Sequence, residues 1–315
     1  MTTPIVCGVD RSEHSRAAAD LASALADRVG LPLLLVHVAP WPSVDPQTRR
    51  KPMGLESAMS DQRRHHERWL DDLASKLATS RVSTRVEVGP VVDWIVATAA
   101  QCSAALLVVG CRGIGSPRSH ALGSVSADLT RRAPCPVIIV PATAARAQGD
   151  PLAGGRIVCG VGGRQDVAVA RLAARLAEGL GLRLTLIHVM PQRGGAAASD
   201  AVEVTDGLPS RLLSDVLGDL EQRQPGNAHD RALRLVPDEV ELRVRRGDVS
   251  QQISALAVSE HAALIVVGSR GRGPLRSGLL GSVSWHLAAD ARRPVMICRR
   301  GLSTHQPPLQ ISAER

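Results

Sequence analysis

The sequence predicts an α/β protein with two tandem domains, each a parallel sheet with helices on both faces. Short apolar runs alternate with longer amphipathic segments along most of the 315 residues. This alternation is typical of parallel sheets whose strands are joined by right-handed helical crossovers. The same series of elements then occurs a second time, which indicates an internal duplication. The length also suits two domains of ordinary size.

The first repeat is predicted from its hydrophobic periodicity and its turn residues. Four prolines between residues 39 and 54 indicate a loop or lid after the second strand. A last apolar run is expected to form an edge strand. The predicted strands are residues 4–9, 33–38, 82–88, 104–110 and 136–140, and the predicted helices are 12–30, 56–79, 91–102 and 124–132.

The second repeat follows a segment rich in Ala, Gly and Pro, which is typical of a linker. A glycine- and alanine-rich lid and a polar insertion interrupt it. Its predicted strands are residues 156–161, 184–189, 240–244, 264–268 and 294–298, with helices at 208–221 and 249–260. The predicted divisions are a first domain (1–141), a linker (142–155), a second domain (156–300) and a flexible tail (301–315).

The composition narrows the function classes. Hydrophobic residues make up 44% and charged residues 22% of the chain, as in a soluble globular protein. We find neither a stretch apolar enough to cross a membrane nor a signal-peptide layout, so a cytoplasmic protein is expected. The net charge is +8, but the arginines are scattered, and Phe and Tyr are absent. These features argue against a nucleic-acid-binding surface with stacking aromatics.

A glycine-rich loop follows the fourth strand of each repeat. The first copy has Gly110, Gly113 and Gly123, with two and nine residues between them, followed by Ser124 as the predicted helix N-cap. The second copy repeats this spacing. Free N–H groups and the helix dipole at such a position favour an anion such as phosphate. The alternative is that these glycines only form turns.

The first crevice is predicted at the carboxyl ends of the strands, where ligands bind in such folds. Asp10 follows the first strand, Val38 ends the second and Gly110 ends the fourth. If the first and fourth strands are neighbours, all three face one crevice. Phosphates would then lie over residues 113–124 and an adenosine between the first two strands. Asp10 has an alternative role as a cap of the first helix.

On these motifs the chain resembles the universal stress protein family, in particular its tandem ATP-binding branch. The resemblance implies two Rossmann-like domains of the adenine nucleotide α hydrolase-like type, with strand order 3-2-1-4-5. It also implies that Asp10 holds the nucleoside, that backbone near Val38 reads the adenine, and that the glycine loop takes the triphosphate of ATP with Mg²⁺.

The predicted ATP-binding residues of the first domain are Gly8, Val9, Asp10, Val38, Gly110, Arg112, Gly113, Gly115, Gly123, Ser124, Val125 and Ser126. Those of the second domain are Gly160, Gly162, Val189, Gly268, Arg270, Gly271, Gly273, Gly281, Ser282, Val283 and Ser284. Gly162 stands where the first domain has Asp10. Loss of a charge-assisted hydrogen bond costs about 1.5–3 kcal/mol, so binding in the second domain is expected to be weaker or altered. No metal site made by the protein alone and no catalytic residue is predicted.

Several other reactive side chains receive structural interpretations. His37 and His188 occupy matching places in apolar strands and are expected to be hydrogen-bonded core residues, with an acid/base role as the alternative. His65 and His66 lie on a charged helix and are expected to be exposed. The six cysteines show no metal-ligand spacing and are expected to be reduced and buried. Cys111, in the glycine loop near a helix N-terminus, has a reactive role as its alternative.

The leading functional hypothesis is a nucleotide-dependent stress-response regulator with at most slow ATP hydrolysis or autophosphorylation. We find neither a P-loop lysine motif nor a nucleophile-elbow motif. The alternatives are a nucleotidyl-transfer or ligase-type enzyme and a nucleotide-free dimerisation scaffold. The fifth strands, residues 137–140 and 295–298, are apolar edges that would be covered by pairing with one another. The resemblance also implies a homodimer of whole chains and a regulatory protein partner.

Overall fold

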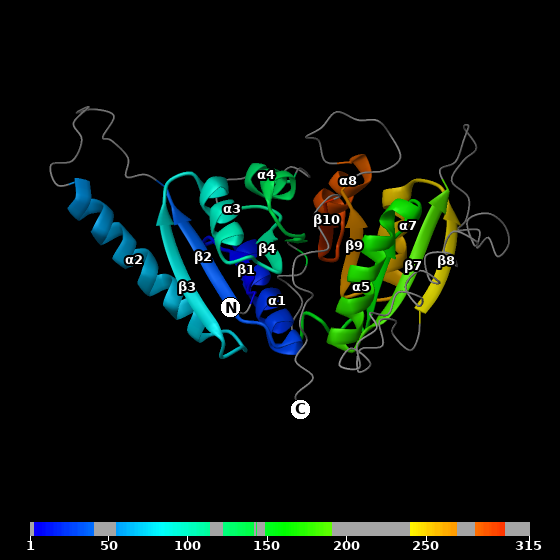
Figure 1. Ribbon diagram of the computed structural model, residues 1–315, viewed down its shortest axis with the longest axis horizontal. Coiled ribbons are helices and arrows are strands. Elements are labelled where there is room, and N and C mark those ends of the chain that lie inside the picture. The colour runs from blue at the N-terminus through cyan, green and yellow to red at the C-terminus, as the bar shows by residue number, and fades with distance from the viewer. Residues whose placement is uncertain are drawn as a thin grey trace.

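The computed structural model describes residues 3–40, 55–113, 122–141, 143, 149–190, 240–269 and 281–299 (Figure 1). The first half contains β1 (Ile5–Gly8), α1 (Glu13–Val29), β2 (Leu33–Ala39), α2 (Leu55–Ser75), β3 (Val82–Val88), α3 (Val91–Gln101), β4 (Leu106–Gly110), α4 (Ser124–Arg132) and β5 (Val137–Val140). The second half contains β6 (Arg156–Gly160), the 3-10 turn η2 (Arg164–Asp166), α5 (Val167–Leu180), β7 (Arg183–Met190), β8 (Val240–Arg246), α7 (Val249–Ser259), β9 (Leu264–Gly268), α8 (Ser282–Asp290) and β10 (Val295–Cys298).

The predicted parallel sheets and their strand order are confirmed. The ten strands form one sheet in the order β3-β2-β1-β4-β5-β10-β9-β6-β7-β8. Within each half all neighbours are parallel, and the local order is 3-2-1-4-5 in both. The expected lids, the helix at 208–221 and the tail lie outside the described residues. The long second helix ends at Ser75, a few residues earlier than predicted.

The two parallel sheets are joined by one antiparallel pair, β5 with β10. Ile138 lies opposite Met296, its counterpart in the other repeat, and Val137 and Ile139 pair with Ile297 and Val295. The pairing is therefore symmetric about the Ile138–Met296 position. Each strand that would otherwise end its sheet covers the other, as the sequence predicted.

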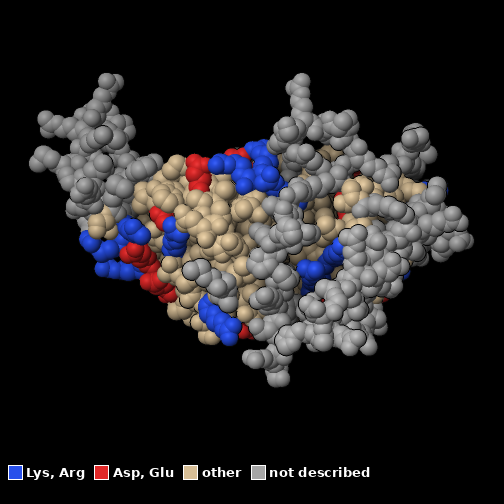
Figure 2. Space-filling model, viewed as in Figure 1, with Lys and Arg blue, Asp and Glu red and all other residues tan. Residues whose placement is uncertain are grey.

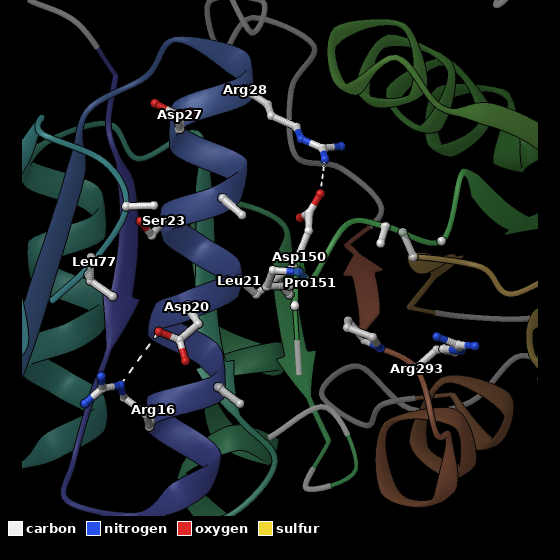
Figure 3. A pocket seen from close by; sticks show the side chains of 18 of the residues that line it. Arg16, Asp20, Leu21, Ser23, Asp27, Arg28, Leu77, Asp150, Pro151 and Arg293 are labelled. Atoms are coloured by element: carbon white, nitrogen blue, oxygen red, sulfur yellow. Dashed lines mark hydrogen bonds and ion pairs between the residues drawn. The ribbon is translucent and has the colours of Figure 1, made fainter. Parts of the chain in front are cut away.

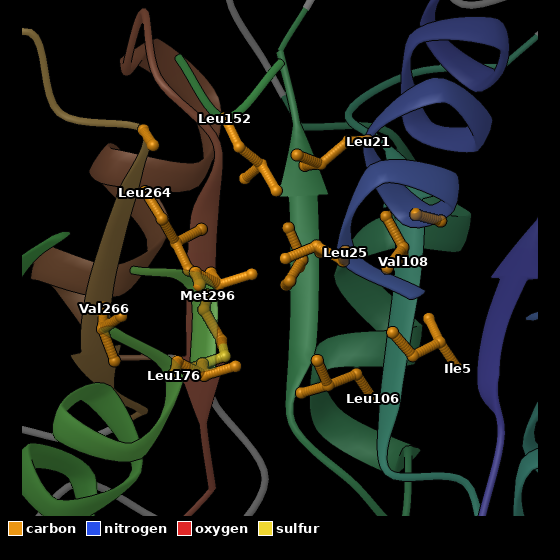
Figure 4. Close-up of a cluster of buried hydrophobic side chains, with 14 of the residues drawn as sticks. Ile5, Leu21, Leu25, Leu106, Val108, Leu152, Leu176, Leu264, Val266 and Met296 are labelled. Carbon is orange, nitrogen blue, oxygen red and sulfur yellow. The ribbon is translucent and has the colours of Figure 1, made fainter. Parts of the chain in front are cut away.

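Helices cover both faces of the sheet, and the buried side chains divide into two clusters accordingly. One cluster joins apolar residues of α1, α2 and α5 with one face of the strands. The other joins residues of α3, α4, α7 and α8 with the opposite face. Figure 4 shows the first cluster where the halves meet, with Leu21, Leu25 and Leu152 facing Leu176 and Met296. The apolar runs that were predicted to be buried strands are therefore packed on both sides.

Helix α1 begins and ends where local chemistry predicts. Ser12 is the N-cap in extended conformation, and its Oγ accepts a hydrogen bond from the N–H of Ser15 at 3.2 Å. Gly30 ends the helix with a φ of 70°, a left-handed conformation that glycine adopts without strain. These two signals fix α1 directly after β1 and aim its N-terminus at the carboxyl end of the sheet.

Candidate functional site

The structure brings the ends of β1, β2 and β4 together. β1 pairs with β2 on one side and with β4 on the other, and both pairs are parallel. The carboxyl ends of these strands therefore lie side by side and bring Asp10, Val38 and Gly110 to the same edge of the sheet, where the first crevice is predicted. The first and fourth strands are therefore neighbours, which was the condition for these three residues to share one site.

Asp10 lies against the glycine loop. Its Oδ1 accepts hydrogen bonds from the N–H of Ser12 at 2.9 Å and from the Ser12 hydroxyl at 2.5 Å. A Cβ atom at Gly113 would lie only 2.5 Å from Asp10 Oδ2, so a side chain at position 113 would displace the carboxylate. The Ser12 hydroxyl also points to the carbonyl of Arg112, at 3.4 Å. Asp10 thus supports the start of α1 and faces the loop at once.

The base of the glycine loop is closed by backbone hydrogen bonds. The N–H of Cys111 donates to Val140 at 2.8 Å, and the N–H of Gly123 donates to the carbonyl of Cys111 at 2.9 Å. The buried Ser126 hydroxyl donates to the carbonyl of Gly110 at 2.7 Å. These bonds hold the N-terminus of α4 beside the end of β4. Gly115 lies outside the described residues.

The prediction that Ser124 is the N-cap of α4 is wrong. Gly123 occupies that position, with φ −60° and ψ 146°, and makes no side-chain cap hydrogen bond. Ser124 is already the first helical residue and its side chain is exposed. The first N–H groups of α4 have no partner within the helix and point out of its end. Glycine at the cap has no side chain that could accept a hydrogen bond from one of these amides.

The second crevice repeats the same backbone plan. Ser284 donates its hydroxyl to the carbonyl of Gly268 at 2.7 Å, and the N–H of Gly281 donates to Ser269 at 2.8 Å. Gly281 is the N-cap of α8, again without a side-chain cap. Gly160, Val189, Ser282 and Val283 keep the positions predicted from the first repeat. Arg270, Gly271 and Gly273 lie outside the described residues.

Sequence reasoning missed Asp166 in the second crevice. Its carboxylate accepts a hydrogen bond from the N–H of Gly162 at 2.8 Å, and the residue is only 5% exposed. Asp166 ends η2 and stands at the N-cap position of α5. An acidic residue directly before an apolar helix was the available signal. The alignment with Asp10 pointed instead to Gly162.

The two strand histidines are confirmed as hydrogen-bonded core residues. His37 and His188 are 6% and 7% exposed, and their Nδ1 atoms lie 2.8 Å and 2.7 Å from the carbonyls of Val9 and Val161. A carbonyl oxygen only accepts, so each Nδ1 carries the proton.

His66 corrects the expectation of an exposed histidine pair. Its ring lies 4.6 Å from that of His37, and Trp69 packs edge-on against His37 at 5.0 Å. Burial, together with the neighbouring His37 and Arg11, lowers the pKa of His66 to about 4. His65 is exposed and hydrogen-bonds to Arg11 at 2.8 Å. The start of α1 and the middle of α2 are therefore joined beside the first crevice.

All six cysteines are free thiols, and five of them are buried, with Cys102 half-buried. Burial raises the pKa of Cys135 and of Cys298 to about 12. Such thiols are poor nucleophiles. Cys111 is 6% exposed, so its side chain is covered although its backbone belongs to the loop.

A separate groove of about 1180 Å³ runs along α1 on the side that faces the linker (Figure 3). Arg16 and Asp20 form an ion pair of 3.7 Å on its wall, and Arg28 pairs with Asp150 across it. None of the predicted nucleotide-binding residues lines this groove. We therefore place the candidate site at the crevices and not in this groove.

The charge distribution on the face in Figure 2 agrees with the sequence analysis. Lys and Arg lie there in separate groups, several of them beside Asp or Glu. Two ion pairs on or next to α2 join Arg63 with Glu67 and Lys76 with Asp72. Along the described ranges, no helix is both long and apolar enough to cross a membrane.

The duplicated parallel sheet and the matching strand ends define a tandem α/β protein, and comparison with known proteins gives its family. The sequence matches the universal stress protein family over residues 1–141 and 155–299. The chain therefore belongs to this family and contains two tandem domains of its type. The residue limits of the linker and tail given above remain a prediction.

Relatives of similar length support this assignment. Universal stress protein Rv2623 of Mycobacterium tuberculosis is 30% identical over 317 residues, which cover 95% of this chain and 97% of that protein. A universal stress protein of Mycolicibacterium smegmatis is 30% identical over 309 residues, covering 94% and 96%. The crystal structure of a universal stress protein from Archaeoglobus fulgidus has the same fold, with a TM-score of 0.63, 18% identity and coverage of 95% and 96%.

Proposed function

We propose that the first domain binds ATP with Mg²⁺ and that the protein is a nucleotide-dependent regulator of a stress response. The observation that carries the proposal is the contact between Asp10 and the glycine loop beside an uncapped helix N-terminus. A helix N-terminus favours phosphate through its free amides and its dipole. A carboxylate beside it suits the hydroxyl groups of a ribose.

The remaining parts of the nucleotide are assigned from the same geometry. The base would lie over the carboxyl ends of β1 and β2, where backbone near Val38 is available to read its edge. Among the described residues there is no group of three or more His, Cys, Asp or Glu placed to hold a metal ion. Mg²⁺ would therefore depend on phosphate oxygens for part of its coordination, as it commonly does.

We propose binding, with at most slow hydrolysis or autophosphorylation, because fast phosphoryl transfer needs several groups in place at once. These include metal ligands, a residue that orients the nucleophile and cations that stabilise the transition state. In the described part of the first crevice, Asp10 is the carboxylate at the loop. In a regulator, the bound nucleotide must change a surface that a partner recognises, and we expect this change at the lid segments. We further propose that the protein is a cytoplasmic homodimer and that it acts on a protein partner.

The test is calorimetric titration of ATP into the full chain and into three variants. Asp10→Ala is expected to weaken binding about tenfold to a hundredfold, the cost of one charge-assisted hydrogen bond. Gly113→Ala is expected to weaken it at least as much, because its Cβ would meet Asp10 Oδ2. Asp150→Ala removes a carboxylate remote from the crevice and serves as the control.

Two results would favour the other functions. Steady release of pyrophosphate with an acceptor would indicate a nucleotidyl-transfer or ligase-type enzyme. Protein that is purified without adenine nucleotide and binds none at millimolar ATP would indicate a scaffold. Equal affinities in all four proteins would also contradict the proposed site.

A further inference from the structure

Buried imidazole nitrogens gather beside the first crevice. Five buried side-chain nitrogen or oxygen atoms lack a hydrogen-bond partner among the described residues, and three of them are His14 Nε2, His37 Nε2 and His66 Nδ1. Buried polar atoms are almost always paired, so each exception calls for an explanation. Because an imidazole can bind a proton, an unpaired ring nitrogen is also a place where the charge of a site can change.

His14 lies where the first crevice meets the glycine loop. It is the second residue of α1, directly after the turn that Ser12 caps. A Cβ atom at Gly110 would lie 2.8 Å from the backbone carbonyl carbon and from the Cβ of His14. The start of α1 is therefore packed directly against the end of β4, at the point where the glycine loop begins.

The charged groups that act on His14 come from three sides of the crevice. They are Asp10 after β1, Glu13 in α1 and Arg112 after β4. Burial has the largest effect and lowers the pKa of His14, Arg112 also lowers it, and the two carboxylates raise it. The ring is therefore neutral near pH 7, and its protonation depends on the charges that lie beside it.

The other two histidines have different surroundings. Burial lowers the pKa of His37, and the carboxylate of Asp10 raises it. Burial, His37 and Arg11 all lower the pKa of His66. Of the three imidazoles, His14 is thus the one that lies between the Asp10 carboxylate and the start of the glycine loop.

We propose that His14 is the proton acceptor of the first nucleotide site: nucleotide binding there takes up a proton from the solvent onto its imidazole, and the affinity rises as the pH falls. The proposal rests on the proposed function of the first domain. Phosphates at the N-terminus of α4 would lie beside residues 110–113 and would bring negative charge near His14. An opposite charge favours the protonated ring, and by linkage a lower pH then favours binding.

The second crevice has no such proton acceptor at the matching position. Gly30 and Gly181 end α1 and α5, and the same count back from each places Gln165 where the first domain has His14. The Gln165 amide folds back on its own turn, because its Oε1 would lie 2.5 Å from a Cβ atom at Gly163. An amide does not titrate in this range, so glutamine is the matched substitution for His14.

Calorimetric titration of ATP with Mg²⁺ into the full chain at pH 7 tests this. It is done in buffers of different ionisation enthalpy, because the dependence of the heat on the buffer counts the protons taken up. We expect net uptake by the wild type and little or none by His14→Gln. Since one pKa unit is a factor of ten, we expect wild-type affinity to rise about threefold to tenfold more than that of His14→Gln between pH 7.5 and about pH 6.

Comparison of the two proteins removes the protonation of ATP itself, which is the same for both. His66→Gln removes another imidazole beside the crevice and is the control, with the uptake and the pH profile of the wild type expected. Circular dichroism checks folding, and His14→Asn is a second variant in case glutamine disturbs the start of α1.

ATP binding without proton uptake, or equal uptake by the wild type and the folded His14 variants, would overturn the inference and leave the proposed function standing. A wild type that binds no ATP would contradict both.

Discussion

At the scale of single residues, His37 and His66 show how burial sets the charge of a group beside the first crevice. His37 Nε2 and His66 Nδ1 are buried, and neither has a hydrogen-bond partner among the described residues. Burial lowers the pKa of both rings, that of His66 to about 4. Both are therefore neutral in the folded protein near pH 7, while an unfolded chain protonates them near pH 6.5.

This difference predicts a pH-dependent stability. Because the folded pKa of His66 lies below the unfolded value, its contribution is present above about pH 6.5 and is lost as the pH falls toward 4. We expect His66→Gln to reduce the acid-induced loss by about 1 kcal/mol, a figure discounted because the ring is only half-buried. Urea unfolding of both proteins at pH 7 and pH 5 measures this. An equal acid loss in the two proteins would contradict the prediction.

At the scale of elements, an ion-pair network holds β6, β7, β8 and the end of α7 together. The Arg156 side chain is 12% exposed and contacts Glu241 at 2.8 Å, Glu260 at 3.5 Å and the buried Thr185 hydroxyl at 2.7 Å. Arg243 contacts the same two glutamates, at 2.5 Å and 3.8 Å. The guanidinium of Arg156 also lowers the pKa of Glu241.

Removal of Arg156 is therefore expected to be costly. Arg156→Met keeps the volume but leaves the two glutamates with less compensation, and we expect a loss of about 2–4 kcal/mol in the free energy of unfolding. Arg28→Met breaks the pair with Asp150, in which both side chains are about a third or more exposed, and we expect less than about 1 kcal/mol. Chemical denaturation compares the two. Equal losses in the free energy of unfolding for the two variants would contradict the prediction that burial of the ion pair determines the loss.

The sequence was sufficient for most elements because their signals are local. Hydrophobic periodicity, turn residues and the duplication predicted the strands, and the apolar edges predicted the pairing of the two last strands. The strand order came from the family resemblance. The sequence alone did not predict contacts that depend on how helices and strands pack against one another. Ser124 has the composition of a cap, but the extended backbone at Gly123 begins the helix one residue earlier. His66 contacts His37, which lies 29 residues earlier in the chain, and the repeat alignment does not show this contact. Asp166 bonds to Gly162 from a position that the repeat alignment with Asp10 did not indicate.

At the scale of the whole molecule, the β5–β10 pair makes two domains into one sheet. Leu152 from the segment before β6 is buried against the first cluster, and Arg28 of α1 contacts Asp150 and the carbonyl of Leu180 in α5. The halves therefore share a core as well as a ladder of hydrogen bonds. Two domains joined only by a flexible linker would share neither the core nor the hydrogen bonds.

The shared core predicts that the halves stay together without their covalent connection. A protease site placed within residues 144–148 and then cut is expected to give two fragments that elute as one particle. Met296→Asp buries a charge at a fully enclosed position of β10 and is expected to separate the fragments. Val258→Asp, at a residue 41% exposed, is the control. Separation of the cut wild type on size-exclusion chromatography would contradict the prediction.

The register of the last strand of each half also determines how close to a glycine loop a fluorophore or affinity tag would be attached. Val140 lies beside Gly110, and Cys298 lies beside Gly268, so the chain leaves each domain next to its glycine loop. A fluorophore or affinity tag joined after β10 therefore starts next to the second crevice. One joined before β1 starts at the end of that strand remote from Asp10. Surface immobilisation through the N-terminus is the better geometry for measuring nucleotide capture by the first domain.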